Sequence, residues 1–224
     1  MKRLLLFLLI FTSVQWIAKG QNPDFEPYSS FGIKQGINYT TVSFSPGVSQ
    51  SMTLGYHGGL VYKYNNQMTE KGWLFALQIE LNYSQKGWTE DLDTISNSYS
   101  RKMDYIEMPF ITQVVLGKKS LKYYINLGTS VGYLLSEKES VIVNNELYRR
   151  EYYEKAIENN VDFGALGEFG LLYETNIGFF QAGIRYQLSL TNLFETTSET
   201  IIRTSQNTTW NFSISYFFYS NNKK

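Results

Sequence analysis

The sequence predicts an all-β protein: an eight-stranded antiparallel up-and-down transmembrane β-barrel, preceded by a cleaved signal peptide. Three observations lead to this fold class. The chain begins with a short basic and apolar segment, continues with stretches in which apolar and polar residues alternate, and is 17% aromatic. Alternation with a period of two is typical of a strand with unlike faces, and aromatic residues are enriched in strands.

The first twenty residues, MKRLLLFLLIFTSVQWIAKG, have the order of a secretory signal peptide. A basic pair, Lys2 and Arg3, precedes an apolar run, and small residues close the segment before Gln21. The run is shorter than the ~20 residues that a membrane-spanning helix needs, which argues against a retained anchor. We therefore expect residues 1–20 to be removed before Gln21 and the chain to be exported through the periplasm.

Composition narrows the class of protein further. Removing Lys2, Arg3 and Lys19 from the 20 basic residues leaves 17 against 20 acidic residues, a net charge of about −3, so nucleic acid is not an expected partner. The chain has no cysteine, so neither a disulfide framework nor a lipid-modified N-terminal cysteine is available. After the signal segment no stretch approaches ~18 consecutive apolar residues, which excludes a helical membrane protein.

Eight alternating stretches follow one another with no helical period between them, as expected for a meander of strands. The first four are FGIKQGINYTTVSF from Phe31, MTLGYHGGLVYKYN from Met52, GWLFALQIELNYSQKG from Gly72 and RKMDYIEMPFITQVVLG from Arg101. The second four are LKYYINLGTSVGYLLS from Leu121, NVDFGALGEFGLLYE from Asn160, FFQAGIRYQLSL from Phe179 and TTWNFSISYFFY from Thr208. Pro109 cannot donate to a strand ladder, so we expect a bulge there.

These stretches define the expected domains: a short periplasmic segment at 21–30, the barrel at 31–219 and a polar tail at 220–224. The links between them fall into two alternating classes. Links at 65–71, 117–120 and 174–177 are short, whereas most of the others are longer and more polar. Short turns at one end of the barrel and long loops at the other are typical of an outer-membrane barrel, whose short turns face the periplasm.

The two faces of each stretch differ in bulk. In the third stretch one face carries large apolar residues and the other small or polar ones: Trp73, Phe75, Leu77, Ile79, Leu81 and Tyr83 against Ala76, Gln78, Glu80 and Asn82. A barrel of ~8 strands is only just wide enough for side chains to fill it. The bulky face must therefore point outward, which suits lipid, and aromatic residues near the strand ends fit interfacial girdles. A soluble ligand-binding barrel with reversed faces and a soluble sandwich remain the alternatives.

With the bulky face outside, a set of charged residues points into the lumen: Lys34, Lys63, Glu80, Glu107, Glu168 and Arg185. Buried charges persist when they are paired and hydrogen-bonded. We therefore expect a lumen charge network that plugs the barrel, with Glu168 nearly opposite Arg185 across the hairpin that turns near Thr175. The alternative is that these charges meet lumen water and pair only loosely.

Six motifs together resemble the PorT-like outer-membrane β-barrel domain family, small outer-membrane barrel proteins of Bacteroidetes-type bacteria. They are FGIKQGINYTTV, YHGGLVYKY, YIEMPFITQVVLG, YINLGTSVGYLLS, DFGALGEFGLLYE and FQAGIRYQLSLTNL. The resemblance implies a small barrel that reaches the outer membrane through the periplasm; a few members are linked to secretion and gliding machinery. The sequence departs from this pattern at its end, where Phe217-Phe218-Tyr219 is followed by SNNKK rather than closing the chain.

The sequence offers little for catalysis. His57 is the single histidine and points inward near Ser45, Ser51 or Ser84, but no spacing selects a nucleophile. Scattered carboxylates define no metal site. We expect no enzyme activity, no cofactor and no bound metal.

The long link at 137–159 is the best candidate for contact with a partner. Its charged and tyrosine-rich part contains Tyr148, Arg149, Arg150, Tyr152 and Tyr153, and tyrosine and arginine are enriched at binding hot spots. A solvated loop with no partner is the alternative. The sequence as a whole predicts a monomeric outer-membrane protein with a structural or interaction role through its extracellular loops. A narrow porin for small solutes and an accessory component of a secretion or gliding system are the other functions considered.

Overall fold

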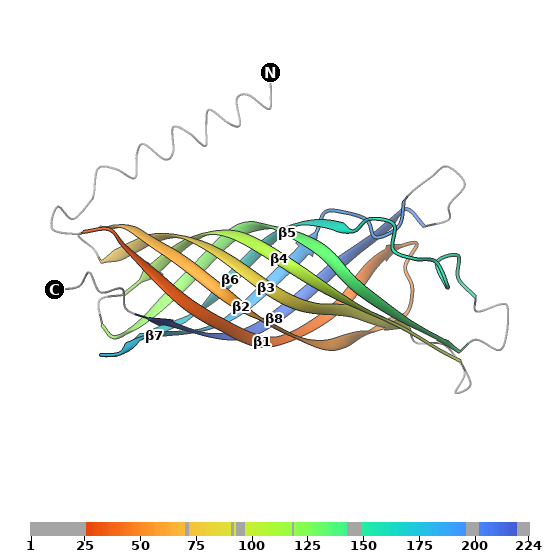
Figure 1. Ribbon diagram of the computed structural model, residues 1–224, viewed down its shortest axis with the longest axis horizontal. Helices are drawn as coiled ribbons and strands as arrows, with labels where there is room; N and C mark the ends of the chain where they lie inside the picture. The colour runs from red at the N-terminus through yellow and green to blue at the C-terminus, as the bar shows by residue number, and fades with distance from the viewer. Residues whose placement is uncertain are drawn as a thin grey trace, which may run out of the picture.

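The computed structural model describes residues 26–69, 72–90, 92, 97–117, 119–142, 149–195 and 202–218. These residues form eight antiparallel strands that close into a barrel in sequence order (Figure 1). The strands are β1 (Tyr28–Ser45), β2 (Gln50–Met68), β3 (Trp73–Glu90), β4 (Ser98–Leu116), β5 (Leu121–Ile142), β6 (Val161–Glu174), β7 (Gly178–Ser189) and β8 (Thr204–Phe218). The predicted eight-stranded antiparallel up-and-down barrel is confirmed.

The strands run further than the alternating stretches indicated, above all at one end. β4 and β5 stay paired as far as Ser98 and Ile142, so residues 137–142 of the expected loop belong to a strand. β1 begins at Tyr28, inside the segment expected to precede the barrel. The expected signal peptide and the polar tail lie outside the described residues. Within the described ranges, no helix is long and apolar enough to cross a membrane.

The expected bulge at Pro109 is absent. β4 keeps one register against β3 on both sides of this residue, and on the other side Pro109 pairs directly with Ser130 of β5. The ladder pairs of β3 and β4 pass from Ile79–Phe110 to Asn82–Glu107 and leave out the position of Pro109. The missing N–H is thus accommodated by a gap in one ladder rather than by an inserted residue.

The outer wall carries the bulky residues, as the alternation predicted. Along β5 the outward side chains are exposed apolar or aromatic groups: Tyr123, Ile125, Leu127, Val131, Tyr133 and Leu135. Between them, Asn126 and Ser130 point inward and are buried. A continuous apolar outer wall around a polar interior is the arrangement of a barrel surrounded by lipid.

This arrangement inverts at the end of the barrel opposite the short turns, on the right in Figure 1. There the inward positions hold a buried apolar cluster, which we call the mouth cluster: Val42, Phe44, Trp88, Tyr99, Met103, Tyr105, Leu134, Tyr152, Tyr153, Ile157, Leu193 and Phe194. The outward positions beside it include exposed Ser43, Lys102, Lys138 and Ser140. An apolar inside and a polar outside suit water, so this end is built like a soluble protein.

A second apolar cluster closes the end that carries the short turns. Its members, the inner-end cluster, are Val61, Leu74, Val115, Tyr124, Leu172, Phe179 and Phe217. The rings of Phe179 and Phe217 stack with centroids 4.6 Å apart, across the β7–β8 pair. The polar lumen therefore lies between two apolar clusters.

Candidate functional site: the closed lumen and its mouth

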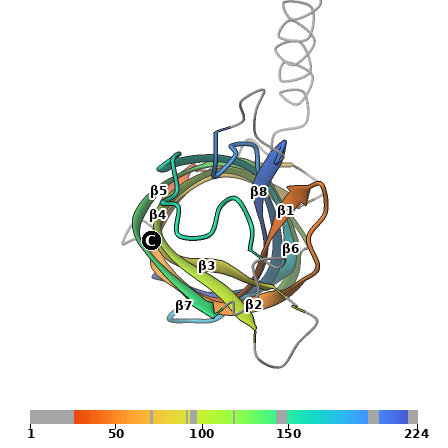
Figure 2. The same cartoon turned by 90° about the vertical axis from the view of Figure 1, so that its right-hand side faces the viewer.

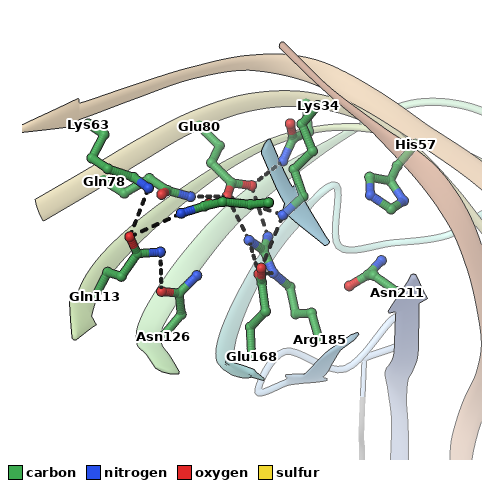
Figure 3. A network of polar contacts seen from close by, with 12 residues as sticks. Lys34, His57, Lys63, Gln78, Glu80, Gln113, Asn126, Glu168, Arg185 and Asn211 are labelled. Atoms are coloured by element: carbon green, nitrogen blue, oxygen red, sulfur yellow. Dashed lines mark hydrogen bonds and ion pairs between the residues drawn. The ribbon is translucent and has the colours of Figure 1, made fainter. Parts of the chain in front are cut away.

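Four charged side chains meet in the lumen between the two clusters (Figure 3). The guanidinium of Arg185 on β7 donates to both oxygens of Glu80 on β3, at 2.6 and 2.9 Å, and to Glu168 on β6 at 2.6 Å. The ammonium of Lys34 on β1 lies 3.3 Å from Glu80 and 3.4 Å from Glu168. All four residues are buried, and two positive charges balance two negative ones. We call this group the lumen quartet.

The register of one hairpin brings Glu168 and Arg185 together. β6 and β7 turn at residues 175–177, and in the resulting ladder Glu168 lies directly opposite Arg185. Glu80 and Lys34 come from strands farther around the barrel, so only closure of the sheet lets their side chains reach the pair. The quartet consequently joins β1, β3, β6 and β7 across the lumen.

Neutral side chains complete the hydrogen bonding of the two carboxylates. Gln78 and Asn82 donate to Glu80 at 2.6 and 2.7 Å, and the phenol of Tyr124 donates to Glu168 at 2.7 Å. Gly183 makes room for that phenol, because a Cβ at this position would lie 2.1 Å from Tyr124 Oη. Buried carboxylates with this many donors are stabilised in their charged form.

A second buried group lies nearer the mouth and centres on Lys86 of β3. Its ammonium is 2.8 Å from Glu107 of β4 and 3.2 Å from Asp162 of β6. Gln187 donates to Glu107 at 2.8 Å, and Ser189 donates to Asp162. Glu107 thus pairs with Lys86 rather than with the four residues of the lumen quartet.

Lys63 stands apart from both groups, next to the inner-end cluster. It is 1% exposed, donates to Gln113 Oε1 at 2.8 Å, and lies 4.2 Å from the ring centroid of Phe217 and 5.1 Å from that of Phe179. A cation held over aromatic faces gains electrostatic stabilisation from the rings. Of the six inward charges expected from the sequence, all are buried, four form the quartet, and Glu107 and Lys63 have other partners.

His57 lies in the polar lumen between the quartet and the mouth. Its Nδ1 is 2.6 Å from Asn38 Oδ1, and its Nε2 is buried with no hydrogen-bond partner among the described residues. Ser84 is opposite His57 in the β2–β3 ladder, but its hydroxyl accepts a hydrogen bond from Asn38 at 3.1 Å. Ser45 and Ser51 have other ladder partners, so Ser84 is the one candidate serine that is paired with His57.

The mouth is closed by residues 149–160, which follow β5. Figure 2, which looks into this end, shows the described part of the chain between β5 and β6 crossing the opening of the barrel. Tyr152 is 1% exposed and stacks between Phe44 and Phe194, with ring centroids 4.9 and 5.5 Å away. Tyr153 stacks on Tyr99 at 4.1 Å. We call residues 149–160 the mouth segment.

Glu90 at the end of β3 anchors the mouth segment from below. Its buried carboxylate accepts hydrogen bonds from the phenols of Tyr152 and Tyr153 and from the indole N–H of Trp88 at 3.4 Å. Burial raises the pKa of both phenols, and the nearby carboxylate of Glu90 raises it further. Both tyrosines therefore stay protonated donors well into the alkaline range.

Arg101 of β4 holds the same segment from the other side. Its guanidinium lies 3.2 Å from Glu137 and 2.6 Å from Glu139 of β5, and it donates to the carbonyl of Lys155 at 2.9 Å. Glu139 in turn accepts the N–H of Glu154 at 3.0 Å, and Glu137 accepts the N–H of Ile157 at 2.9 Å. Two buried charged residues, Glu90 and Arg101, thus fix the position of the mouth segment.

The five residues expected to meet a partner do not share one environment. Tyr152 and Tyr153 point into the barrel and are buried, so their side chains do not face the medium. Arg149 and Arg150 are exposed, and Tyr148 lies outside the described residues. Tyrosines in a charged link are typical of a surface, but Tyr152 and Tyr153 pack into the aromatic mouth cluster and donate hydrogen bonds to Glu90.

Four buried charged residues of the lumen and mouth were not predicted from the sequence: Lys86, Glu90, Arg101 and Asp162. The signal for Lys86 and Asp162 was present, since each continues the inward alternation of its stretch, after Ser84 and before Gly164. Glu90 and Arg101 lie at or beyond the limits assigned to the stretches. Within the described residues, no group of three or more His, Asp or Glu side chains is arranged to hold a metal ion.

Comparison with known proteins adds a family match. The model of a family described as "Outer membrane protein beta-barrel domain" matches residues 20–195. No curated protein sequence matches the chain.

Several solved structures are similar to this chain, among them the following three. Ail, the attachment invasion locus protein of Yersinia pestis, in complex with the heparin analogue sucrose octasulfate, is 14% identical, and the match covers 87% of this chain and 100% of Ail with a TM-score of 0.42. The outer membrane protein OprG from Pseudomonas aeruginosa is 10% identical, and the match covers 87% of this chain and 98% of OprG with a TM-score of 0.46. Neisserial surface protein A is 11% identical, and the match covers 84% of this chain and 98% of that protein with a TM-score of 0.44.

Proposed function

Because the chain belongs to the outer membrane protein beta-barrel domain family, we propose that it is a structural and interaction protein of the bacterial outer membrane. In this role its lumen stays closed, and its water-exposed end meets other envelope or extracellular proteins. In this role the chain carries out no catalysis and holds no cofactor.

The packing of the lumen is the observation that carries this proposal. The quartet and the Lys86 group fill the middle of the barrel with paired side chains, and an apolar cluster closes each end. A pore would need a continuous wet path through these groups. The side chains instead bond to one another, which favours a rigid plug over a channel.

The end of the barrel beyond the lipid supports an interaction role. The pairing of β5 with β6 ends at Tyr133, whereas the pairing of β5 with β4 continues as far as Ile142. The open end of the β4–β5 hairpin, opposite its short turn, therefore projects past β6, with exposed Lys138 and Ser140 along β5. We call this end the projecting hairpin. Unpaired strand edges and exposed charged side chains are common sites of protein contact.

We propose further that the chain is a PorT-like member of this family. This membership rests on the six strand motifs quoted above, from FGIKQGINYTTV to FQAGIRYQLSLTNL. In that setting the barrel would be an accessory component of a secretion or gliding system, held in the outer membrane, with the projecting hairpin as its point of contact.

Planar lipid bilayers test the closed lumen. We expect the wild-type protein to show no steady conductance, because two clusters and the quartet block the path. The double variant Glu168→Gln/Arg185→Gln removes one charge of each sign and should also remain silent, since the two apolar clusters persist. Steady wild-type conductance that rises in the double variant would instead identify a narrow porin and contradict the plug.

Crosslinking in intact cells tests the interaction role. The chain has no cysteine, so a single Lys138→Cys variant carries one photoactivatable label on the projecting hairpin. We expect a covalent adduct with another envelope or extracellular protein. The matched control is Ser120→Cys in the short β4–β5 turn at the opposite end, which should give no such adduct. Equal labelling at both positions, or none at 138, would reject the hairpin as a contact site.

A further inference from the structure

A shallow apolar groove of about 820 Å³ lies on the outer wall, across β6, β7, β8, β1 and β2. Its lining consists mainly of outward side chains, among them Ile37, Phe169, Ala182, Ile184, Phe212 and Ile214. Ala182 is the smallest of these, and the larger neighbours stand around it. The convex wall of the barrel is thus locally hollowed at the depth of the lipid chains.

Gln35 of β1 stands at the edge of this groove and is exposed. It alternates with Ile33 and Ile37 on the outward face, and the aromatic residues that mark the ends of this face, Phe31 and Tyr39, are each four residues away. The structure gives its amide no hydrogen-bond partner among the described residues. An unpaired amide costs several kcal/mol in hydrocarbon, where nothing can bond to it.

The space around Gln35 is open as well. Its neighbour across the β1–β2 ladder is Gly58, whose added Cβ would meet only the carbonyl oxygen of Lys34, at 3.4 Å. The neighbour on the other side is Ile214 of β8. Elsewhere in the outward belt, Thr112 and Thr129 are polar, but their short hydroxyls can bond to their own backbone. The longer side chain of Gln35 instead presents amide donors and an acceptor on the outer surface of the barrel.

We propose that this face binds a second copy of the same chain, with Gln35 of one copy hydrogen-bonded to Gln35 of the other. Lipid acyl chains can fill an apolar groove, but they cannot satisfy an amide. A second glutamine amide can, because it carries both a donor and an acceptor. This dimer departs from the monomer expected from the sequence and does not depend on the interaction role proposed above.

The symmetry of a membrane dimer fits this placement. Two copies with the same orientation are related by a two-fold axis along the membrane normal, so each residue near the axis faces its own image at the same depth. The groove on the β8 side of Gln35 then faces the β2–β3 side of the other copy. There Leu60 and Leu81 are 62% and 49% exposed and provide apolar side chains to fill it.

Disulfide formation in native outer membranes tests the dimer directly. In the cysteine-free chain, Gln35→Cys should form a disulfide-linked dimer on mild oxidation, visible on a non-reducing gel. Thr129→Cys is the matched control, because it also faces outward but lies on β5, four strands around the ring from β1. Equal yields at the two positions, or a monomer at both, would mean that lipid alone covers the groove and would overturn the proposal.

A second measurement isolates the amide itself. Energy transfer between donor and acceptor labels at Lys138→Cys reports dimers in lipid vesicles without changing position 35. Adding Gln35→Leu should weaken the dimer by about tenfold, the scale of a polar contact within a membrane. Adding Thr129→Leu should leave the transfer unchanged. If Gln35→Leu has no effect, the amide pair does not hold the copies together.

Discussion

Replacing Arg185 with glutamine is expected to lower the free energy of unfolding of the barrel by about 3–5 kcal/mol, the cost of leaving a buried charge without its partner. Arg185 makes charged hydrogen bonds to both Glu80 and Glu168, which are 1% and 5% exposed. Without it, Lys34 faces two buried carboxylates alone, so the quartet changes from neutral to a net charge of −1. Urea unfolding in lipid vesicles, followed by the heat-modifiable shift on gels, measures the loss.

Two matched variants separate the charge effect from the loss of a large side chain. Glu168→Gln/Arg185→Gln leaves one Lys34–Glu80 pair and a neutral lumen, so it should be more stable than Arg185→Gln alone despite carrying one more substitution. Arg149→Ala removes the exposed Arg149–Glu154 pair and should cost less than about 1 kcal/mol. If the double variant is the less stable of the two, the quartet is not held by charge balance.

Within the membrane-spanning part of each strand, the sequence was enough to predict which side chains point outward and which point inward, because the same physical requirement holds along the whole span. Lipid requires apolar groups outside, and a narrow lumen admits only small or paired polar groups inside, so alternation alone distinguishes the faces. The turn near Thr175 then sets the register that brings Glu168 opposite Arg185. Closure of the barrel, which brings Lys34 and Glu80 to this pair, follows from eight strands in sequence order.

The structure of the mouth could not be predicted in the same way, because at this end of the barrel the inward positions are apolar and the outward positions are polar. Once the strands leave the lipid, water lies outside, and the inward positions become apolar: Val42 and Phe44 continue the inward face of Lys34 and Asn38 on β1. A rule that places bulky residues outside fails for Trp88 and Tyr99, which are completely buried. The mouth segment has no alternation at all, and its position depends on Glu90 and Arg101, which are distant in sequence.

Replacing Tyr152 with alanine is expected to destabilise the mouth by about 3–5 kcal/mol, the range for a large aromatic side chain lost from a core. The change removes the ring stacked between Phe44 and Phe194 and also withdraws one hydrogen bond from the buried carboxylate of Glu90. Because the lumen quartet is untouched, the barrel should stay folded while the mouth segment opens. Trypsin added to intact cells measures this opening through cleavage after Arg150 and Lys155.

The phenylalanine variant divides this effect into packing and hydrogen bonding. Tyr152→Phe keeps the stacked ring and leaves Glu90 with the phenol of Tyr153 and the indole of Trp88, so about 1–3 kcal/mol should be lost and cleavage should rise less. Tyr123→Ala, at an exposed tyrosine near the opposite end, should leave cleavage at the mouth unchanged. Rapid cleavage of the wild-type segment would show that Tyr152 does not hold it in place. Unfolding of the whole barrel by Tyr152→Ala would show instead that the mouth and the lumen unfold as one cooperative unit. In that case a partner that displaces the mouth segment would also destabilise the lumen quartet.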